Sequence, residues 1–280
     1  MIAYCRTFLS LALVMFLFSC KKDQGPINDP PALPPKPPVK HVLLKDVISP
    51  NLPSPYYHFE YNSDSLASKV DFASGFSIYD VIYTGNKIGE MRNNIIVNHD
   101  TLRYTYDSAG KLTLIKFINE SNIVYRLVFF TYDGDLIKKI EWNIKVDNIG
   151  YYIDRRVTFS FFPDSNLMTM VDFRAAYNGS PDQTLTTRFE QYDDKINVDD
   201  FILLHDEFHD HLFLLQGFRL QKNNPAKETF SVNDTVLYTN DYTYNYNADN
   251  TPSNKKGDFL YFSGPDAGKK FVTNSAYTYY

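Results

Sequence analysis

The segment Tyr104-Thr105-Tyr106-Asp107-Ser108-Ala109-Gly110-Lys111-Leu112, followed by Ile115, carries the clearest structural signal in this 280-residue chain. Two aromatic residues at i and i+2 lie on the same face of a β-strand. An Asp in the next position opens a turn by bonding to nearby backbone, and the Gly accepts the positive φ that ends it. Leucine and isoleucine then return on a second strand. The segment therefore predicts a β-hairpin with one apolar face.

Variants of this segment recur along the chain. A second clear copy is Phe130-Thr131-Tyr132-Asp133-Gly134-Asp135-Leu136, and weaker copies begin at Phe59, Val81, Phe159, Phe189 and Tyr242. The tyrosine-equivalent positions 61, 83, 106 and 132 are separated by 22, 23 and 26 residues, which is room for two strands and two turns. Repeated modules of this kind gain stability by packing on their neighbours. Because the Tyr-Asp pair returns at every turn, we interpret it as structural and not as catalytic.

Alternation with a period of two continues between the copies. Ile140, Trp142 and Ile144 alternate with Lys139 and Glu141, as in a half-buried strand. Aromatic residues make up 16% of the chain, and β-strands favour them. The sequence predicts an all-β domain over residues 41–280. We expect an antiparallel β-meander of repeated hairpins, twisted and partly rolled. One short helix is expected near 201–212, where apolar residues return at helical spacing.

The hairpin segment resembles the YD, or RHS-type, repeat, whose hairpins join into curling antiparallel sheets. Three later blocks, 192–197, 222–228 and 244–252, are similar in content and order to a set of Bacteroidota lipoproteins of unknown function. Several copies lack the turn glycine, and Val198 stands where that set leads us to expect proline. The resemblance implies a repeat-built sheet and brings no activity with it.

The N-terminus indicates export. Arg6 precedes an apolar run from Phe8 to Phe18, which is too short to span a bilayer and fits a signal peptide over 1–19 better than a membrane anchor. Leu17-Phe18-Ser19-Cys20 resembles the lipobox of bacterial lipoproteins, in which the cysteine receives lipid and becomes the first residue. This resemblance implies lipidation at Cys20. The Lys21-Lys22-Asp23 run after it points to the outer membrane, either at its periplasmic face or at the cell surface.

Residues 20–40 are expected to hold the domain away from that lipid. Seven of the 15 prolines lie between Pro26 and Pro38. Proline fixes its own φ and favours extended geometry in the residue before it. We interpret the segment as a semi-rigid stalk that follows the lipidated cysteine.

Composition excludes several functions. The net charge of −5 leaves no basic stripe for nucleic acid. The only other cysteine, Cys5, lies in the signal peptide, so the mature domain has no pair for a disulfide and no thiol for catalysis. Gly-x-Ser-x-Gly and phosphate-binding glycine loops are absent from the sequence. We expect no cofactor.

One dense cluster could bind metal. His205, His209 and His211 lie within seven residues, and on a helix the first two share a face. Asp206 occupies the position where the zincin signature requires Glu, and the sequence identifies no third ligand beyond the cluster. The alternative is a polar segment that covers one end of the sheet. The acidic pairs Asp193/Asp194 and Asp199/Asp200 leave calcium open, with solvated turns as the simpler interpretation.

The expected function is non-catalytic. The sequence favours a membrane-anchored binding or scaffold module at the outer membrane or cell surface, with a glycan or a protein as partner. Exposed tyrosines could stack on sugar rings, although cross-strand packing explains them as well. The alternative function is a metal-dependent hydrolase that uses His205, His209 and His211.

Overall fold

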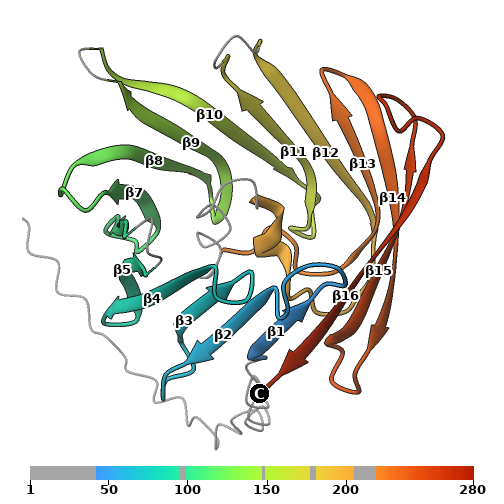
Figure 1. Ribbon diagram of the computed structural model, residues 1–280, viewed down its shortest axis with the longest axis horizontal. Helices are drawn as coiled ribbons and strands as arrows, with labels where there is room; N and C mark the ends of the chain where they lie inside the picture. Colours follow the sequence, from blue (N-terminus) through green and yellow to red (C-terminus); the bar gives the residue numbers. More distant parts are fainter. Residues whose placement is uncertain (1–41, 95–98, 147–148, 177–180, 205–217) are drawn as a thin grey trace, which may run out of the picture. The chain divides into compact units, whose positions relative to one another are not determined.

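The predicted hairpins are present, and they join into a closed barrel (Figure 1). The computed structural model describes residues 42–94, 99–146, 149–176, 181–204 and 218–280. Within these residues sixteen antiparallel strands follow each other in chain order, and β1 (Leu44–Ile48) pairs with β16 (Lys270–Tyr279) to close the ring. The intervening strands are β2 (Tyr57–Tyr61), β3 (Ala67–Phe72), β4 (Ser77–Thr84), β5 (Lys87–Asn93), β6 (Thr101–Tyr106), β7 (Leu112–Ile118), β8 (Val124–Asp133), β9 (Leu136–Val146), β10 (Gly150–Phe161), β11 (Leu167–Arg174), β12 (Gln183–Tyr192), β13 (Pro225–Val232), β14 (Thr235–Tyr246) and β15 (Pro252–Tyr261).

The prediction of an all-β antiparallel domain is confirmed, and the prediction of a partly rolled sheet is wrong. The sheet closes completely, with Val47 opposite Tyr277 and Ile48 opposite Ala276. The backbone N–H of Tyr280 also donates to the carbonyl of Leu43 at 3.1 Å. Closure removes both unpaired sheet edges, which would otherwise expose backbone donors and acceptors.

The turn chemistry of the repeat is as predicted. In the β6–β7 hairpin the backbone N–H of Lys111 donates to the Asp107 carboxylate at 2.8 Å. The N–H of Asp107 donates to the Lys111 carbonyl at 2.9 Å, and Gly110 has a φ of 85°. A residue with a Cβ would be strained in that left-handed conformation, so glycine is the suitable residue there.

Alternation along the strands separates an apolar interior from a charged exterior. Ile140 and Trp142 of β9 are buried inside the barrel, as the sequence predicts. Between them Glu141 faces outward and pairs with Lys139 at 3.2 Å and with Arg156 of β10 at 2.8 Å. The core therefore lies on the inner side of the ring of strands.

A short 3₁₀ helix, η1 (Asp200–Leu204), lies inside the ring of strands (Figure 1). The ring of its Phe201 packs edge-on against Tyr57 at 5.2 Å and against Phe59 at 5.5 Å. Of the segment 201–212, for which the sequence predicts a helix, residues 201–204 belong to this 3₁₀ turn and residues 205–212 lie outside the described residues. No helix among the described residues is long and apolar enough to cross a membrane.

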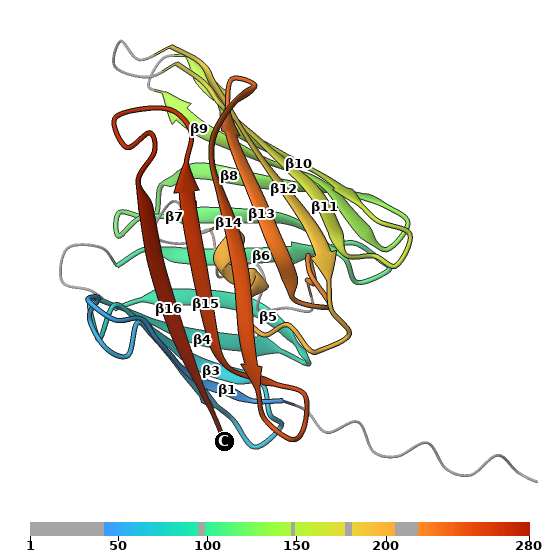
Figure 2. The same ribbon diagram turned by 90° about the vertical axis from the view of Figure 1, so that its right-hand side faces the viewer.

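The two ends of the barrel carry different turns, and Figure 2 shows them at opposite edges of the wall. We call the end with the turns that follow even-numbered strands the tyrosine end, because the repeat tyrosines lie there. The opposite end, called the rim, carries the turns that follow odd-numbered strands. Both the N-terminal start of β1 and the last residue, Tyr280, are at the tyrosine end.

Candidate functional site

A belt of tyrosine hydroxyls runs around the tyrosine end. In seven of the eight described hairpins, a tyrosine near the end of the even-numbered strand donates its hydroxyl to a backbone carbonyl near the start of the preceding strand. The pairs are Tyr61 to Leu44, Tyr83 to Ala67, Tyr106 to Ile88, Tyr132 to Leu112, Tyr192 to Leu167, Tyr244 to Pro225 and Tyr279 to Pro252, with distances from 2.5 to 3.0 Å. We call these seven residues the tyrosine belt.

The belt explains why the repeat uses tyrosine. Each hydroxyl pairs with a carbonyl of the preceding strand at the open end of that hairpin, opposite its rim turn, where the ladder between the two strands ends. Burial raises the pKa of Tyr83 and of Tyr106 to about 12, so both stay protonated and can donate at neutral pH. In β10 the corresponding position is Phe161, which has no hydroxyl. The tyrosine of the Tyr-Asp pair therefore has a structural role.

The three late blocks of the sequence converge on one another at this end. The N–H of Asp193 donates to the carbonyl of Asn224, and the N–H of Asn197 donates to the carbonyl of Lys222, both at 3.0 Å. The N–H of Ile196 reaches the carbonyl of Asn250 at 3.2 Å. Segments 193–204 and 218–224, which we call the plug, are thus fastened to the barrel by backbone hydrogen bonds.

Buried amides and carboxylates hold the plug. The Asn166 side chain accepts the N–H groups of Lys222 and Asn223 at 2.9 and 3.0 Å, which links the β10–β11 turn to the plug. The Asn197 side chain accepts the N–H groups of Asp199 and Asp200 at 3.0 and 2.9 Å, which caps η1. These side chains satisfy backbone donors that would otherwise be buried without a partner.

Asp200 is the most buried carboxylate of the plug, at 3% exposure. It accepts the N–H groups of Leu220 at 2.8 Å and Gln221 at 3.3 Å, and Arg219 lies 3.4 Å away. Burial raises the pKa of Asp200 above its ordinary value of 3.8, and the cation and the N–H donors only partly oppose this.

This raised pKa predicts how stability depends on pH. Between 3.8 and the folded value, the folded state binds a proton at Asp200 that the unfolded state has released. The stabilisation is therefore present below pH 3.8 and is lost as the pH rises through the folded pKa. Urea unfolding across this range should give a free energy of unfolding that falls more with rising pH for the unsubstituted chain than for Asp200→Asn. Parallel profiles for the two proteins would contradict the assignment.

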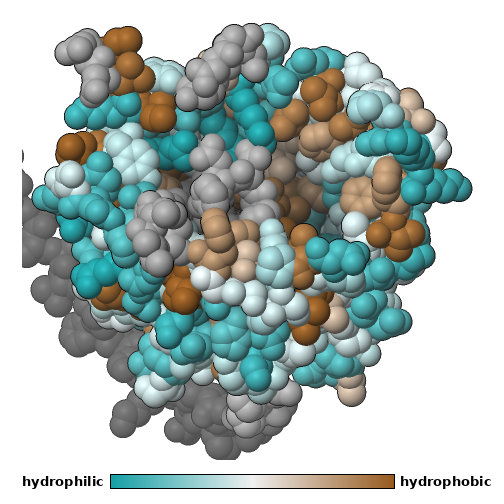
Figure 3. All heavy atoms as spheres, in the orientation of Figure 1, coloured by the Kyte–Doolittle hydropathy of each residue, from teal (hydrophilic) through white to brown (hydrophobic). Residues whose placement is uncertain are grey.

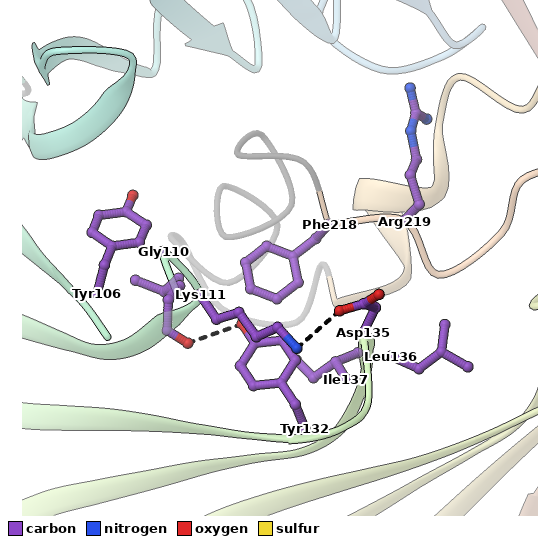
Figure 4. Close-up of a pocket in the computed structure, with 10 residues that line it drawn as sticks. Tyr106, Gly110, Lys111, Tyr132, Asp135, Leu136, Ile137, Phe218 and Arg219 are labelled. Atoms are coloured by element: carbon purple, nitrogen blue, oxygen red, sulfur yellow. Dashed lines mark hydrogen bonds and ion pairs between the residues drawn. The ribbon is translucent and has the colours of Figure 1, made fainter. Parts of the chain in front are cut away.

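A pocket of about 190 Å³ opens beside the plug at the tyrosine end (Figure 4). The belt residues Tyr106 and Tyr132 line it together with Phe218 of the plug, whose ring stacks on Tyr132 at 6.1 Å. Lys111 lies over the Tyr132 ring at 5.5 Å and pairs with Asp135 at 3.0 Å. We call this the mouth pocket.

A second pocket of about 170 Å³ lies on the other side of Phe218 and Arg219. Phe59, Tyr61 and Phe201 contribute aromatic surface, and Asp200 contributes its carboxylate. The Arg219 side chain is 55% exposed and donates to the carbonyl of Asn197 at 3.2 Å. Phe218 and Arg219 thus form a wall between two small, partly aromatic pockets.

The residues predicted to bind metal have different outcomes. His205, His209 and His211 lie outside the described residues. Three of the four acidic candidates for calcium accept hydrogen bonds from other parts of the protein. Asp193 accepts from Asn224, Asp199 from Tyr277 and Lys255, and Asp200 from Leu220 and Gln221. The fourth, Asp194, pairs with its neighbour Lys195. No three His, Cys, Asp or Glu side chains converge on a metal position within the described part of the chain.

The sequence did not identify the mouth pocket. Phe218 and Arg219 lie in no repeat, and only the closed ring brings them against the β6–β7 and β8–β9 turns. A usable signal was present in Lys111 and Asp135, charged residues of two successive turns that end on the same side of the sheet.

The barrel resembles two solved structures of porin-like proteins. One, from Bacteroides uniformis, has a TM-score of 0.57 and 13% identity, and the match covers 80% of this chain and 89% of that one. The other, from Bacteroides vulgatus, has a TM-score of 0.56 and 15% identity, with 85% of this chain and 99% of that one covered. No protein-family model and no curated protein matches the sequence. At these identities the likeness establishes the fold, a porin-like closed barrel.

Proposed function

We propose that the chain is an outer-membrane lipoprotein whose barrel, built from YD-type hairpins, stands in water beside the bilayer as a non-catalytic binding module. In this proposal the lipid on Cys20 holds the protein at the periplasmic face or at the cell surface. The 20–40 stalk links the barrel to that lipid. The partner is a glycan or a protein.

The polarity of the barrel wall carries this proposal. A barrel that spans a membrane presents an apolar band about 25 Å tall to lipid and encloses a polar lumen. Here the arrangement is reversed, with Trp142, Ile140 and their neighbours inside and Glu141 outside. Charged networks recur around the exterior, including Glu90 with Arg92 and Arg103, and Lys256 with Asp258. An Arg or Lys side chain on a lipid-facing wall destabilises a membrane barrel by about 2–4 kcal/mol at the bilayer midplane. The charged exterior of this barrel is therefore suited to contact with water and not with lipid.

The mouth pocket supports a glycan as the ligand. Aromatic faces suit the apolar faces of sugar rings, and fixed polar groups beside them give orientation. Tyr106, Tyr132 and Phe218 supply ring surface, and Lys111, Asp135 and Arg219 supply donors and an acceptor. The volume of about 190 Å³ suits one sugar residue of a longer chain.

The anchor is tested with Cys20→Ser in a Gram-negative host. The unsubstituted chain should incorporate labelled palmitate and partition into membranes, whereas the variant should incorporate none. The purified variant should stay monodisperse without detergent and should give no conductance in planar bilayers. Stepwise conductance would refute a water-facing barrel, and an unlabelled wild-type chain would refute lipidation.

The binding site is tested with Phe218→Ala on a glycan array and by calorimetry with any glycan retained. Loss of the ring should weaken binding by roughly tenfold, as expected when one stacking contact is removed. Phe76→Ala at the rim is the matched control, because it removes the same side chain far from the pocket. Equal affinities for the two variants would remove the mouth pocket from the proposal, and absence of any retained glycan would leave a protein partner.

A further inference from the structure

The rim of the barrel exposes a large apolar side chain at most of its hairpin tips. Phe76 and Phe262 are each 54% exposed, and Ile149 is 77% exposed. We call the following six residues the rim tips: Leu52, Phe76, Ile123, Ile149, Val236 and Phe262, one from each of the β1–β2, β3–β4, β7–β8, β9–β10, β13–β14 and β15–β16 hairpins. The tips of the other two rim hairpins, β5–β6 and β11–β12, lie partly outside the described residues, as do residues 147–148 of the β9–β10 tip.

The tyrosine end has a different composition. Its turns are built from Asp, Asn, Ser and Gly, as in the β6–β7 turn described above. Exposed large apolar residues at that end are limited, among the described residues, to Ile82 on the outer wall of β4, Ile196 and the C-terminal Tyr280. Because both ends face the same solvent, turn geometry alone does not require apolar tips at the rim. The rim thus has an apolar character that the turns of the tyrosine end lack.

We propose that the rim tips rest on the lipid bilayer to which the chain is anchored. The proposal rests on the lipid tether of the proposed function, which keeps the barrel within reach of that bilayer. Six tips from hairpins around one mouth of a closed barrel are distributed along a ring, and polar residues such as Ser74 and Asn233 lie in the same turns. This arrangement suits shallow insertion into the interfacial layer of a flat membrane, where apolar and aromatic side chains are favourable.

The length of the tether permits this orientation. The chain enters the barrel at the tyrosine end, away from the rim. A proline-rich segment of twenty residues reaches roughly 60 Å at about 3 Å per residue. The longest strands have 12 residues and so extend about 40 Å at most, at about 3.3 Å per residue. The reach of the tether therefore exceeds the length of the longest strands, so it allows the rim to face the membrane and the mouth pocket to be directed away from it.

Vesicle sedimentation tests the proposal without the acyl chains. The mature chain from residue 20, carrying Cys20→Ser, is mixed with vesicles of phosphatidylethanolamine and phosphatidylglycerol at millimolar lipid. It should bind measurably. The triple variant Phe76→Ser, Ile149→Ser, Phe262→Ser should bind roughly tenfold more weakly, since interfacial affinity follows buried apolar area. The matched control is Ile82→Ser, Phe129→Ser, Ile196→Ser, which removes three exposed apolar side chains elsewhere and should leave binding unchanged.

Each other outcome overturns the inference. It fails if the unsubstituted chain does not sediment with vesicles, or if the rim variant and the control lose binding equally. Sedimentation velocity without vesicles is the second measurement, and association that only the rim variant abolishes would assign the rim to a second copy of the chain. These results do not depend on whether Cys20 is lipidated, since palmitate labelling tests that separately.

Discussion

Replacing Asp172 with alanine should lower the free energy of unfolding by about 3–5 kcal/mol, the cost of removing one member of a buried ion pair. Asp172 of β11 faces the lumen and forms a two-pronged pair with Arg155 of β10, with distances of 3.0 and 2.9 Å. Both side chains are almost fully enclosed, at 5% and 7% exposure. The Arg155 guanidinium also lies over the Trp142 ring at 4.6 Å, so it cannot move out to water without disturbing the core. Urea unfolding of the purified domain measures the loss.

Two controls separate charge burial from the deletion of a side chain. Asp258→Ala breaks the pair with Lys256 on the outer wall, where both side chains are nearly half exposed, and should cost about 0–1 kcal/mol. The double variant Arg155→Met, Asp172→Leu removes both buried charges and should recover most of the stability. If Asp172→Ala and Asp258→Ala cost the same, the lumen is wetter than the burial of this pair indicates.

The local structure could be predicted from the sequence because it depends on neighbouring residues. The inward position of Ile140 and Trp142 follows from their alternation with Lys139 and Glu141, and the β6–β7 turn follows from Asp107 and Gly110. Polar residues inside the barrel, such as Asp172, could not be predicted in this way. A charged residue at an inward position interrupts the alternation of apolar and polar residues, and the sequence does not show which residue of the next strand pairs with it.

Closure could not be predicted because it depends on contacts between distant residues. The pairing of Val47 with Tyr277 joins segments 230 positions apart. Nothing in the local sequence of either segment indicates which segment it pairs with. The plug could not be predicted for the same reason, since Asn166 contacts Asn223 across 57 positions. The sequence contains one signal of this belt, because tyrosine and not phenylalanine stands near the end of almost every even-numbered strand. A hydroxyl retained at a repeated position indicates a repeated acceptor.

The hydrogen bonds between the belt tyrosines and these backbone carbonyls should contribute strongly to stability. The triple variant Tyr83→Phe, Tyr106→Phe, Tyr132→Phe should lower the free energy of unfolding by about 2–4 kcal/mol, from roughly 1 kcal/mol for each hydrogen bond lost. The substitution keeps the rings and removes only the hydroxyls that reach the carbonyls of Ala67, Ile88 and Leu112. Urea unfolding with an unchanged m-value would assign the loss to the folded state.

Tyr151→Phe is the matched control for this variant. Its hydroxyl also donates to a backbone carbonyl, that of Val124 at 2.9 Å, but the side chain is 42% exposed and lies outside the belt. Water can replace the lost partner there, so the cost should be a few tenths of a kcal/mol at most. If the three belt substitutions together cost no more than this control, the tyrosines act through their rings alone. Phe161 of β10, the single phenylalanine of the series, would then stabilise its hairpin as well as the tyrosines stabilise theirs. The hydroxyls at the other hairpins would contribute nothing to the stability of the closed barrel.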